Sequence, residues 1–250
     1  MSLVLIESIT REISRITLNN PKRLNVLSKQ LIADLNMALD TLEADDQVKC
    51  VILTGAGKAF SAGADLAEVQ STTLKDIKEN DFIEDWQRLA AFSKPVIAAV
   101  NGYAFGGGLE LALMTDIIIA SNTAQFGQPE IKLSLLPGGG GTQRLTRLIG
   151  KINTMNLCLT GESISADKAF TLGLLNKVVN EDELISASIQ LAEMITSHSL
   201  PQLKMIKQAI KAADELPLKD GMKLERSFFY KTFESPESRK AINAFLSKER

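Results

Sequence analysis

The chain has 250 residues and a formal net charge of −2, from 28 lysines and arginines against 30 aspartates and glutamates. This balance does not favour a dedicated nucleic-acid-binding protein. Apolar residues make up 45% of the chain and charged residues 23%, a composition that rules out disorder as the dominant state and predicts a substantial buried core.

In chain order, the first half alternates short strand-like runs with helical patterns. Ser28 is predicted to cap a helix, and a second helix is predicted over residues 74–92. The first helix carries one apolar stripe, formed by Leu31, Leu35, Leu39 and Leu42. Strands are predicted over residues 13–18, 50–54, 95–100 and 116–120. Such alternation is typical of an α/β fold around a mostly parallel sheet.

From about Thr142 onward the pattern changes, because strand-like runs almost vanish. Just before the change, residues 137–141 combine one proline with four glycines, which favours a tight, structured loop. Helices are predicted over residues 165–172, 181–197, 201–215, 218–233 and 236–248. The last four of these helices are expected to form a helical appendage.

The two cysteines, Cys50 and Cys158, lie far apart in the sequence, and His198 is the single histidine. A zinc site built from these residues is therefore not expected. The N-terminal segment becomes charged before a signal-peptide core could form, and no uncharged stretch is long enough for a membrane-spanning helix. We expect a soluble protein of the reducing cytoplasm, without metal or membrane partner.

Two nucleotide-binding motifs fail on inspection. Residues 55–57 follow a predicted strand, but Phe60 stands where a dinucleotide-binding fingerprint needs its third glycine. Residues 102–107 have the glycine spacing of a phosphate-binding loop, yet Gly108 and Leu109 replace the lysine and hydroxyl residue that such a loop requires. Neither kind of nucleotide site is predicted.

Ser61 lies in a segment that is one residue away from the nucleophile motif of serine hydrolases. The only imidazole base available to it is His198, between two predicted surface helices. We favour the alternative in which His198 is a solvated residue between helices and Ser61 is not a nucleophile.

Glycines at 106–108 open a predicted helix and leave backbone N–H groups unpaired at its positive end. A second loop, residues 62–65, also leads into a short helix. Two N–H groups that converge on one carbonyl oxygen would suit chemistry at a thioester. The alternative, that the glycines allow close packing and that Asp65 is only a helix N-cap, stays open at this point.

Two glutamates are the plausible proton-transfer groups. Glu110 lies one helical turn after the last glycines, among apolar neighbours that would bury it and raise its pKa. Glu130 follows another strand-like run. The alternative for each is a solvated surface charge.

The segments that contain these residues occur together in a recognisable order. They are residues 59–66, with Ala62-Gly63-Ala64-Asp65; residues 101–111, with Gly106-Gly107-Gly108-Leu109-Glu110; residues 126–130, with Gln128-Pro129-Glu130; and residues 137–145 and 160–162. The chain resembles an enoyl-CoA hydratase of the crotonase superfamily, over essentially its whole length. This resemblance implies an α/β spiral core of ββα units over residues 1–195. It also implies a helical trimerisation region over residues 196–250, and commonly a hexamer of two trimers.

The resemblance also implies roles for individual residues. The N–H groups of Ala64 and Gly107 would form an oxyanion hole around the thioester oxygen. Glu110 would activate a water molecule for attack at C3, and Glu130 would deliver a proton to C2. The backbone of Gly138 would help to hold that water. No cofactor is implied, because coenzyme A is part of the substrate.

Coenzyme A carries phosphates that need nearby cations. By resemblance, its site would be lined by Lys22, Arg23, Lys58, Ala62, Asp65 and Leu66, and by Phe245 and Lys248 from a neighbouring subunit. The alternatives are solvated lysines and a core contact for Phe245.

The leading hypothesis is reversible syn hydration of a trans-2-enoyl-CoA to the 3-hydroxyacyl-CoA. The alternatives are a Δ3,Δ2-enoyl-CoA isomerase and an RNA-binding or scaffolding protein without the chemistry. Lys204, Lys207 and Lys211 form a basic stripe at helical spacing, for which we favour a solvated surface. Trp86 and Leu89 either line the acyl pocket or fill the core, and packing in the core is the favoured reading.

Overall fold

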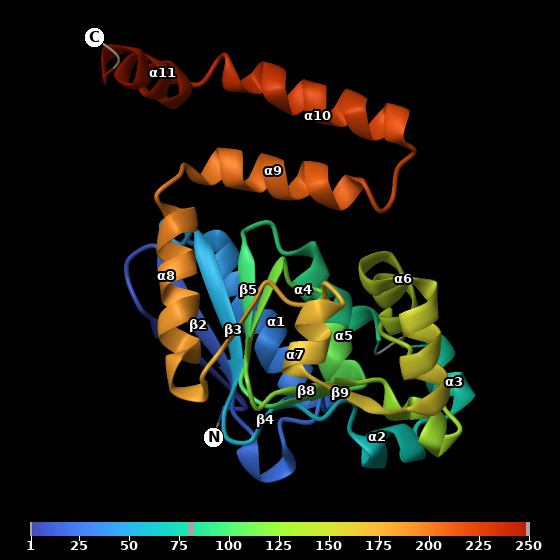
Figure 1. The fold of residues 1–250 in the computed structure, drawn as a ribbon. Helices are drawn as coiled ribbons and strands as arrows, with labels where there is room; N and C mark the ends of the chain where they lie inside the picture. The colour runs from blue at the N-terminus through green and yellow to red at the C-terminus, as the bar shows by residue number, and fades with distance from the viewer. Residues whose placement is uncertain (1, 80–82, 249–250) are drawn as a thin grey trace.

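A six-stranded sheet forms the centre of the computed structural model, which describes residues 2–79 and 83–248 (Figure 1). The strands run in the order β1 (Val4–Ser8), β2 (Ile13–Leu18), β3 (Cys50–Gly55), β5 (Val96–Val100), β7 (Ile117–Ser121) and β10 (Lys177–Val179). The β1–β2 pair is antiparallel, and every other neighbouring pair is parallel. The four predicted strands are confirmed, with ends shifted by one residue at most.

A smaller sheet lies beside the first and contains β4 (Ala59–Ser61), β6 (Tyr103–Phe105), β8 (Gln125–Gly127) and β9 (Ser163–Ser165). Its first three strands each follow a strand of the large sheet after a short turn. A helix or helical turn then follows each pair of strands, in the predicted ββα repeat. Three-residue strands carry too little periodicity to be predicted, and so β9 and β10 were missed in the second half of the chain.

Helices cover both faces of the large sheet. On one face lies α1 (Lys29–Ala44), whose predicted leucine stripe is buried. The predicted N-cap is confirmed, because the Ser28 hydroxyl oxygen accepts a 3.2 Å hydrogen bond from the N–H of Leu31. On the other face lies α8 (Leu184–Thr196), which packs Leu184 and Ala192 against Ile52 and its neighbours on the sheet. The helical pattern alone placed this helix in the appendage, which is wrong, since β3 is buried on both faces and needs a second covering layer. The core range implied by the resemblance, residues 1–195, includes nearly all of this helix.

The single helix predicted over residues 74–92 is also wrong. The region holds α3 (Leu74–Glu79), a turn at Ile83, the 3₁₀ turn η2 (Glu84–Trp86) and α4 (Gln87–Ala91). The break lets Trp86 and Leu89 enter the core, where they are 3% and 1% exposed. The expected packing in the core is confirmed for Leu89. Trp86 is buried as well, but it packs against Gly107 and Gly139, two glycines of the segments expected to form the site.

The remaining elements connect these layers. They are η1 (Pro21–Arg23), α2 (Leu66–Ser71), α5 (Gly107–Leu113), η3 (Pro129–Leu133), α6 (Gly141–Thr160), α7 (Ala166–Thr171) and η4 (Glu181–Glu183). The backbone of Gly150, with φ 78° and ψ 160°, kinks α6. No helix in the described ranges has the length and apolarity that crossing a bilayer requires.

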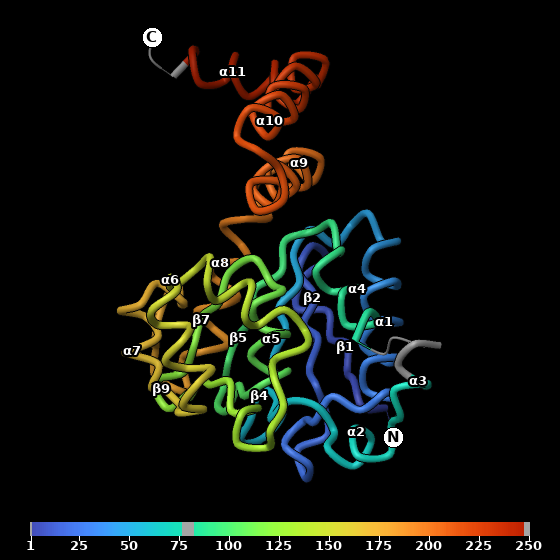
Figure 2. Tube along the Cα trace, turned by 90° about the vertical axis from the view of Figure 1, so that its right-hand side faces the viewer, coloured from blue at the N-terminus to red at the C-terminus, as the bar shows by residue number. Residues whose placement is uncertain are grey.

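Three helices form the appendage: α9 (Leu200–Ala212), α10 (Leu218–Thr232) and α11 (Pro236–Lys248). Figures 1 and 2 show α9 lying on the core, with α10 running back along α9 on its outer side and α11 at the far end. The appendage therefore touches the core mainly through α9.

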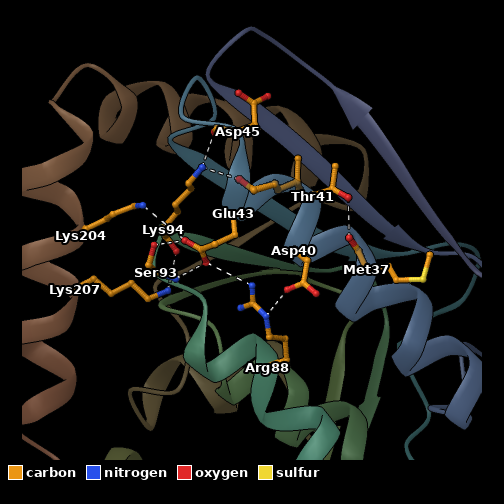
Figure 3. Close-up of polar contacts among 11 residues, drawn as sticks. Met37, Asp40, Thr41, Glu43, Asp45, Arg88, Ser93, Lys94, Lys204 and Lys207 are labelled. Atoms are coloured by element: carbon orange, nitrogen blue, oxygen red, sulfur yellow. Dashed lines mark hydrogen bonds and ion pairs between the residues drawn. The ribbon is translucent and has the colours of Figure 1, made fainter.

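The lysine stripe on α9 is the surface by which this helix docks on the core (Figure 3). The expectation of a solvated stripe is wrong, because packing against the core places all three ammonium groups beside oxygen atoms. Lys207 is the most buried of the three, at 9% exposure. Its Nζ donates to the backbone oxygen of Lys94 at 2.8 Å and pairs with Oδ2 of Asp116 at 2.7 Å. Lys204 pairs with Glu43 at 3.7 Å, and Lys211 donates to the backbone oxygen of Ala90.

Candidate active site

The backbone N–H groups of Ala64 and Gly107 lie close together where α5 begins. Gly63 has a φ of 100°, and a Cβ atom on it would lie 2.7 Å from the carbonyl oxygen of Phe105 and 3.2 Å from the nitrogen of Gly107. A Cβ atom on Gly107 would in turn lie 3.4 Å from the nitrogen of Ala64. Neither of these two N–H groups donates to an acceptor among the described residues. The glycines thus allow a close approach that leaves two adjacent donors free.

Glu110 projects from α5 one turn after these donors and is 2% exposed. Its Oε1 accepts a 2.7 Å hydrogen bond from the N–H of Gly141, and the carboxylate also accepts one from the N–H of Gly139. Burial raises the pKa of Glu110, while these two hydrogen bonds and the charge of Arg144 oppose that rise. The alternative of a solvated glutamate is excluded at this position.

Glu130 lies in η3, and its carboxylate approaches the start of α5. A Cβ atom on Gly106 would lie 2.9 Å from its Oε1, and its Oε2 is buried without a hydrogen-bond partner among the described residues. Burial, and to a lesser degree the charge of Glu110, raise the pKa of Glu130 to about 7. The structure therefore brings the two predicted carboxylates close enough to repel each other.

A buried amide completes the polar surroundings of this site. Gln128 is fully buried, and neither Nε2 nor Oε1 has a partner among the described residues. A Cβ atom on Gly141 would lie 1.8 Å from that Nε2. Unpaired buried polar atoms are costly, and bound water or substrate would satisfy them. Gln128 was not predicted to belong to the site, because a single glutamine beside a strand carries no distinctive signal.

The glycine loop before α6 supports Glu110. Gly138 is exposed, and a Cβ atom on it would meet no atom within 4 Å. Gly140, with φ 104°, adopts a left-handed conformation that favours glycine. The Arg144 side chain folds back over this loop and donates to the Gly139 carbonyl oxygen at 2.7 Å. The predicted tight loop is confirmed, and its N–H groups point at a carboxylate.

The indole of Trp86 packs between the two halves of the site. A Cβ atom on Gly107 would lie 2.6 Å from its Cζ3, and one on Gly139 would lie 3.2 Å from its Cε3. Trp86 therefore contacts both the N–H pair and the loop that holds Glu110. Glycine at positions 107 and 139 makes room for the ring.

Two of the residues expected to bind coenzyme A, Arg23 and Asp65, meet at the start of α2. Arg23 and Asp65 form a two-bonded ion pair, with Nη1–Oδ2 at 2.8 Å and Nη2–Oδ1 at 3.0 Å. Asp65 is 4% exposed and also caps α2 by accepting from the N–H of Ala67. Asp65 therefore caps α2, but it is not only an N-cap, since its carboxylate also engages Arg23.

The other expected contacts divide into two groups. Lys22, Lys58 and Leu66 are exposed, and Ala62 is half-buried. Phe245 is 64% exposed on α11, which lies beyond α9 and α10 and far from α5 (Figure 1). Lys248 ends α11, and its side chain lies outside the described part of the structure. Within one chain, the last two residues are not brought to the carboxylates.

The serine-hydrolase alternative has no geometric support. Ser61 is fully buried, and its Oγ donates to the backbone oxygen of Asn25 at 2.8 Å. His198 is exposed in the connection between α8 and α9, at the opposite end of the sheet from β4 (Figure 1). Across residues 2–79 and 83–248, no group of three or more histidine, cysteine, aspartate or glutamate residues is arranged to hold a metal.

The chain is similar to known proteins over most of its length. The enoyl-CoA hydratase/isomerase family profile matches residues 8–250. A probable mitochondrial enoyl-CoA hydratase of Dictyostelium discoideum is 48% identical over 233 residues, which cover 93% of this chain and 84% of the relative. A mitochondrial enoyl-CoA hydratase of Pongo abelii is 47% identical over 235 residues, 94% of this chain and 81% of the relative.

Solved structures give the same result. Enoyl-CoA hydratase subunit I from Geobacillus kaustophilus superposes with a TM-score of 0.95 at 39% identity, covering 98% of this chain and 95% of the other. An enoyl-CoA hydratase from Bacillus anthracis superposes with a TM-score of 0.93 at 34% identity, covering 98% and 96%. The predicted crotonase-like α/β fold is confirmed. With a family match over nearly its full length, the chain belongs to the enoyl-CoA hydratase/isomerase family.

Proposed function

We propose that this chain is an enoyl-CoA hydratase that adds water reversibly to a trans-2-enoyl-CoA to give the 3-hydroxyacyl-CoA. The observation that carries the proposal is the pair formed by the buried Glu110 and the half-buried Glu130, next to the free N–H groups of Ala64 and Gly107. The close relatives with enoyl-CoA hydratase names support the same assignment.

In this proposal the two N–H groups bind the thioester oxygen. Attack of water at C3 pushes electron density onto that oxygen, and donors already placed there stabilise the enolate-like charge without reorganising. The α5 N-terminus adds its dipole to the effect. Ala64 and Gly107 contribute only main-chain atoms, which is why their own side chains are absent or small.

Glu110 and Glu130 divide the proton transfers. Glu110, in its ionised form, takes a proton from the water as that water attacks C3, and Glu130, in its protonated form, delivers a proton to C2. A pKa of about 7 keeps a large share of Glu130 protonated near neutral pH. The exposed backbone of Gly138 would help to hold the water between the two carboxylates.

Coenzyme A, as part of the substrate, would lie along the turns that carry Lys22, Arg23 and Lys58. A Cβ atom on Gly57 would lie 2.9 Å from Cβ of Pro21, so the turns bearing Lys22 and Lys58 adjoin. Their exposed cations are free to meet the phosphates. Lys58→Ala distinguishes this role from the alternative in which the lysines are only solvated.

The assembly we propose is a homotrimer or a homohexamer, in which Phe245 and Lys248 reach the coenzyme A of a neighbouring subunit. Apolar side chains left uncovered in the single chain support this proposal. On α6 they are Leu148, Ile152, Met155 and Leu159; on α10 they are Phe229 and Tyr230, followed by Phe233 directly after its end. The cytoplasmic setting stays a prediction.

The test is turnover of crotonyl-CoA, followed by the loss of absorbance of the conjugated thioester, and then of a panel of longer 2-enoyl-CoA substrates. We expect Glu110→Gln and Glu130→Gln each to lower kcat by about 10²-fold while the protein stays folded. Near-wild-type hydration by either variant would overturn the assignment. An isomerase would instead turn over a 3-enoyl-CoA faster than the 2-enoyl substrate.

A further inference from the structure

Arg144 lies in the first turn of α6 and bridges two separate parts of the site. Its Nη1 donates to the carbonyl oxygen of Gly139 at 2.7 Å, and its Nη2 donates to Oε1 of Gln87 at 3.0 Å. Gln87 begins α4, directly after Trp86. A Cβ atom on Gly140 would lie 2.2 Å from Nη1. Glycine at this position lets the half-buried guanidinium sit against the loop.

The peptide groups that Arg144 holds are the ones that hold Glu110. Gly139 gives its carbonyl oxygen to Arg144 and its N–H to Glu110, and Gly141 gives a second N–H to the same carboxylate. An unanchored glycine loop has more conformational freedom than any other sequence. The bond from Arg144 therefore limits where the two N–H groups, and with them the carboxylate, can lie.

The charge of Arg144 acts unequally on the two carboxylates. It lowers the pKa of Glu110 against the rise that burial causes, whereas no cation among the described residues opposes the rise in the pKa of Glu130. Two other titratable groups face Glu110: Glu130 from η3 and Cys158 from α6. Burial and the charges of both glutamates raise the pKa of Cys158, so its thiol is neutral. Asp214, in the turn after α9, faces Arg144 itself.

We propose that Arg144 is a positioning residue for Glu110, which anchors the Gly139–Gly141 loop and keeps this carboxylate, rather than Glu130, as the ionised member of the pair. The proposal rests on the hydratase function proposed above. Arg144 assigns the roles of base and acid through the loop and through its charge.

The experiment compares four variants by kcat, KM and the pH profile of kcat/KM for crotonyl-CoA, with thermal unfolding to check folding. Arg144→Met removes charge and hydrogen bonds, Arg144→Lys keeps the charge, and Gln87→Ala removes only the second bond. Arg147→Met is the matched control, because Arg147 lies on the same helix and its side chain bonds only to the backbone oxygen of Gln143 and to Asp214.

For Arg144→Met we expect kcat to fall about 10- to 100-fold with little change in KM. The acid limb of the pH profile of kcat/KM should move to higher pH by about one unit, because the charge that lowers the pKa of Glu110 is lost. Arg144→Lys should keep the wild-type acid limb with part of the kcat loss. Gln87→Ala should keep the acid limb as well, and Arg147→Met should match the wild type.

An unchanged acid limb in a folded Arg144→Met protein, or equal shifts in Arg144→Met and Arg147→Met, would overturn the proposal. If Arg144→Met does not fold, a shifted acid limb in Arg144→Lys would overturn it instead. Wild-type protein and Glu110→Gln are measured alongside. Absence of hydration by the wild type contradicts the proposed function, whereas hydration that depends on Glu110 but not on Arg144 contradicts this inference alone.

Discussion

The backbone N–H of Gly141 donates a 2.7 Å hydrogen bond to Oε1 of Glu110, which lies 31 residues earlier in the chain. A Cβ atom on Gly141 would lie 3.0 Å from that same oxygen and 1.8 Å from Nε2 of Gln128. Position 141 therefore accommodates glycine alone, because any side chain would displace either the carboxylate or the buried amide.

We expect Gly141→Ala to lower kcat for hydration by about tenfold or more, since the added methyl group moves Glu110 or Gln128. A second substitution, Gln128→Ala, removes the nearer obstacle and should restore part of the loss. Steady-state kinetics of the single and double variants check this. Gly221→Ala, where a Cβ atom meets nothing within 4 Å, should keep the wild-type kcat. Full activity of Gly141→Ala alone would contradict the geometry.

The pH dependence of hydration follows from the shared protons of Glu110 and Glu130. The active pair holds one proton, and because the pKa of Glu130 is raised to about 7, kcat/KM should fall as the pH rises past that value and the last proton leaves. Since the overall reaction consumes no proton, the profiles for hydration and dehydration should superimpose. Rates of hydration measured on both sides of a pH of about 7 test the alkaline limb, and a kcat/KM that stays constant well above it would contradict a catalytic proton on Glu130.

Lys207→Met tests whether α9 is held to the core by its lysine stripe. The substitution leaves Oδ2 of Asp116 without its ammonium partner and the Lys94 carbonyl without its donor. We expect the free energy of unfolding to fall by about 2 kcal/mol, measured by urea denaturation at fixed protein concentration. Lys223→Met, which breaks an exposed pair with Asp220, should cost well under 1 kcal/mol. Equal losses in the two variants would argue against the docking role.

Lys58→Ala tests the proposed coenzyme A site. Loss of an exposed cation near the phosphates should raise KM for crotonyl-CoA about two- to fivefold and leave kcat unchanged, with a smaller effect at high salt. A substrate in which coenzyme A is replaced by a pantetheine thioester should show no difference between variant and wild type. Lys168→Ala, an exposed lysine on α7, is the control. A KM effect that persists with the pantetheine substrate would place Lys58 outside the phosphate site.

The strands and the first helix were predictable because their signals are local. The Leu31 to Leu42 stripe and the cap at Ser28 depend only on residues within one helix. The segment over residues 74–92 was mispredicted because burial of Trp86 and Leu89 in the core outweighs its helical pattern. Local preference decides a structure only where tertiary packing agrees with it.

The same division holds for the site. The segments that contain Ala64, Gly107, Glu110 and Glu130 were enough to indicate the family, because their residues and their order resemble the motifs of enoyl-CoA hydratases. The roles of Lys207 and Arg144 were not predictable, because a basic residue on a helix has the same local pattern whether water or a carbonyl oxygen meets it. Contacts between distant segments, and the pKa differences that burial creates, arise only when the folded chain excludes water from those residues.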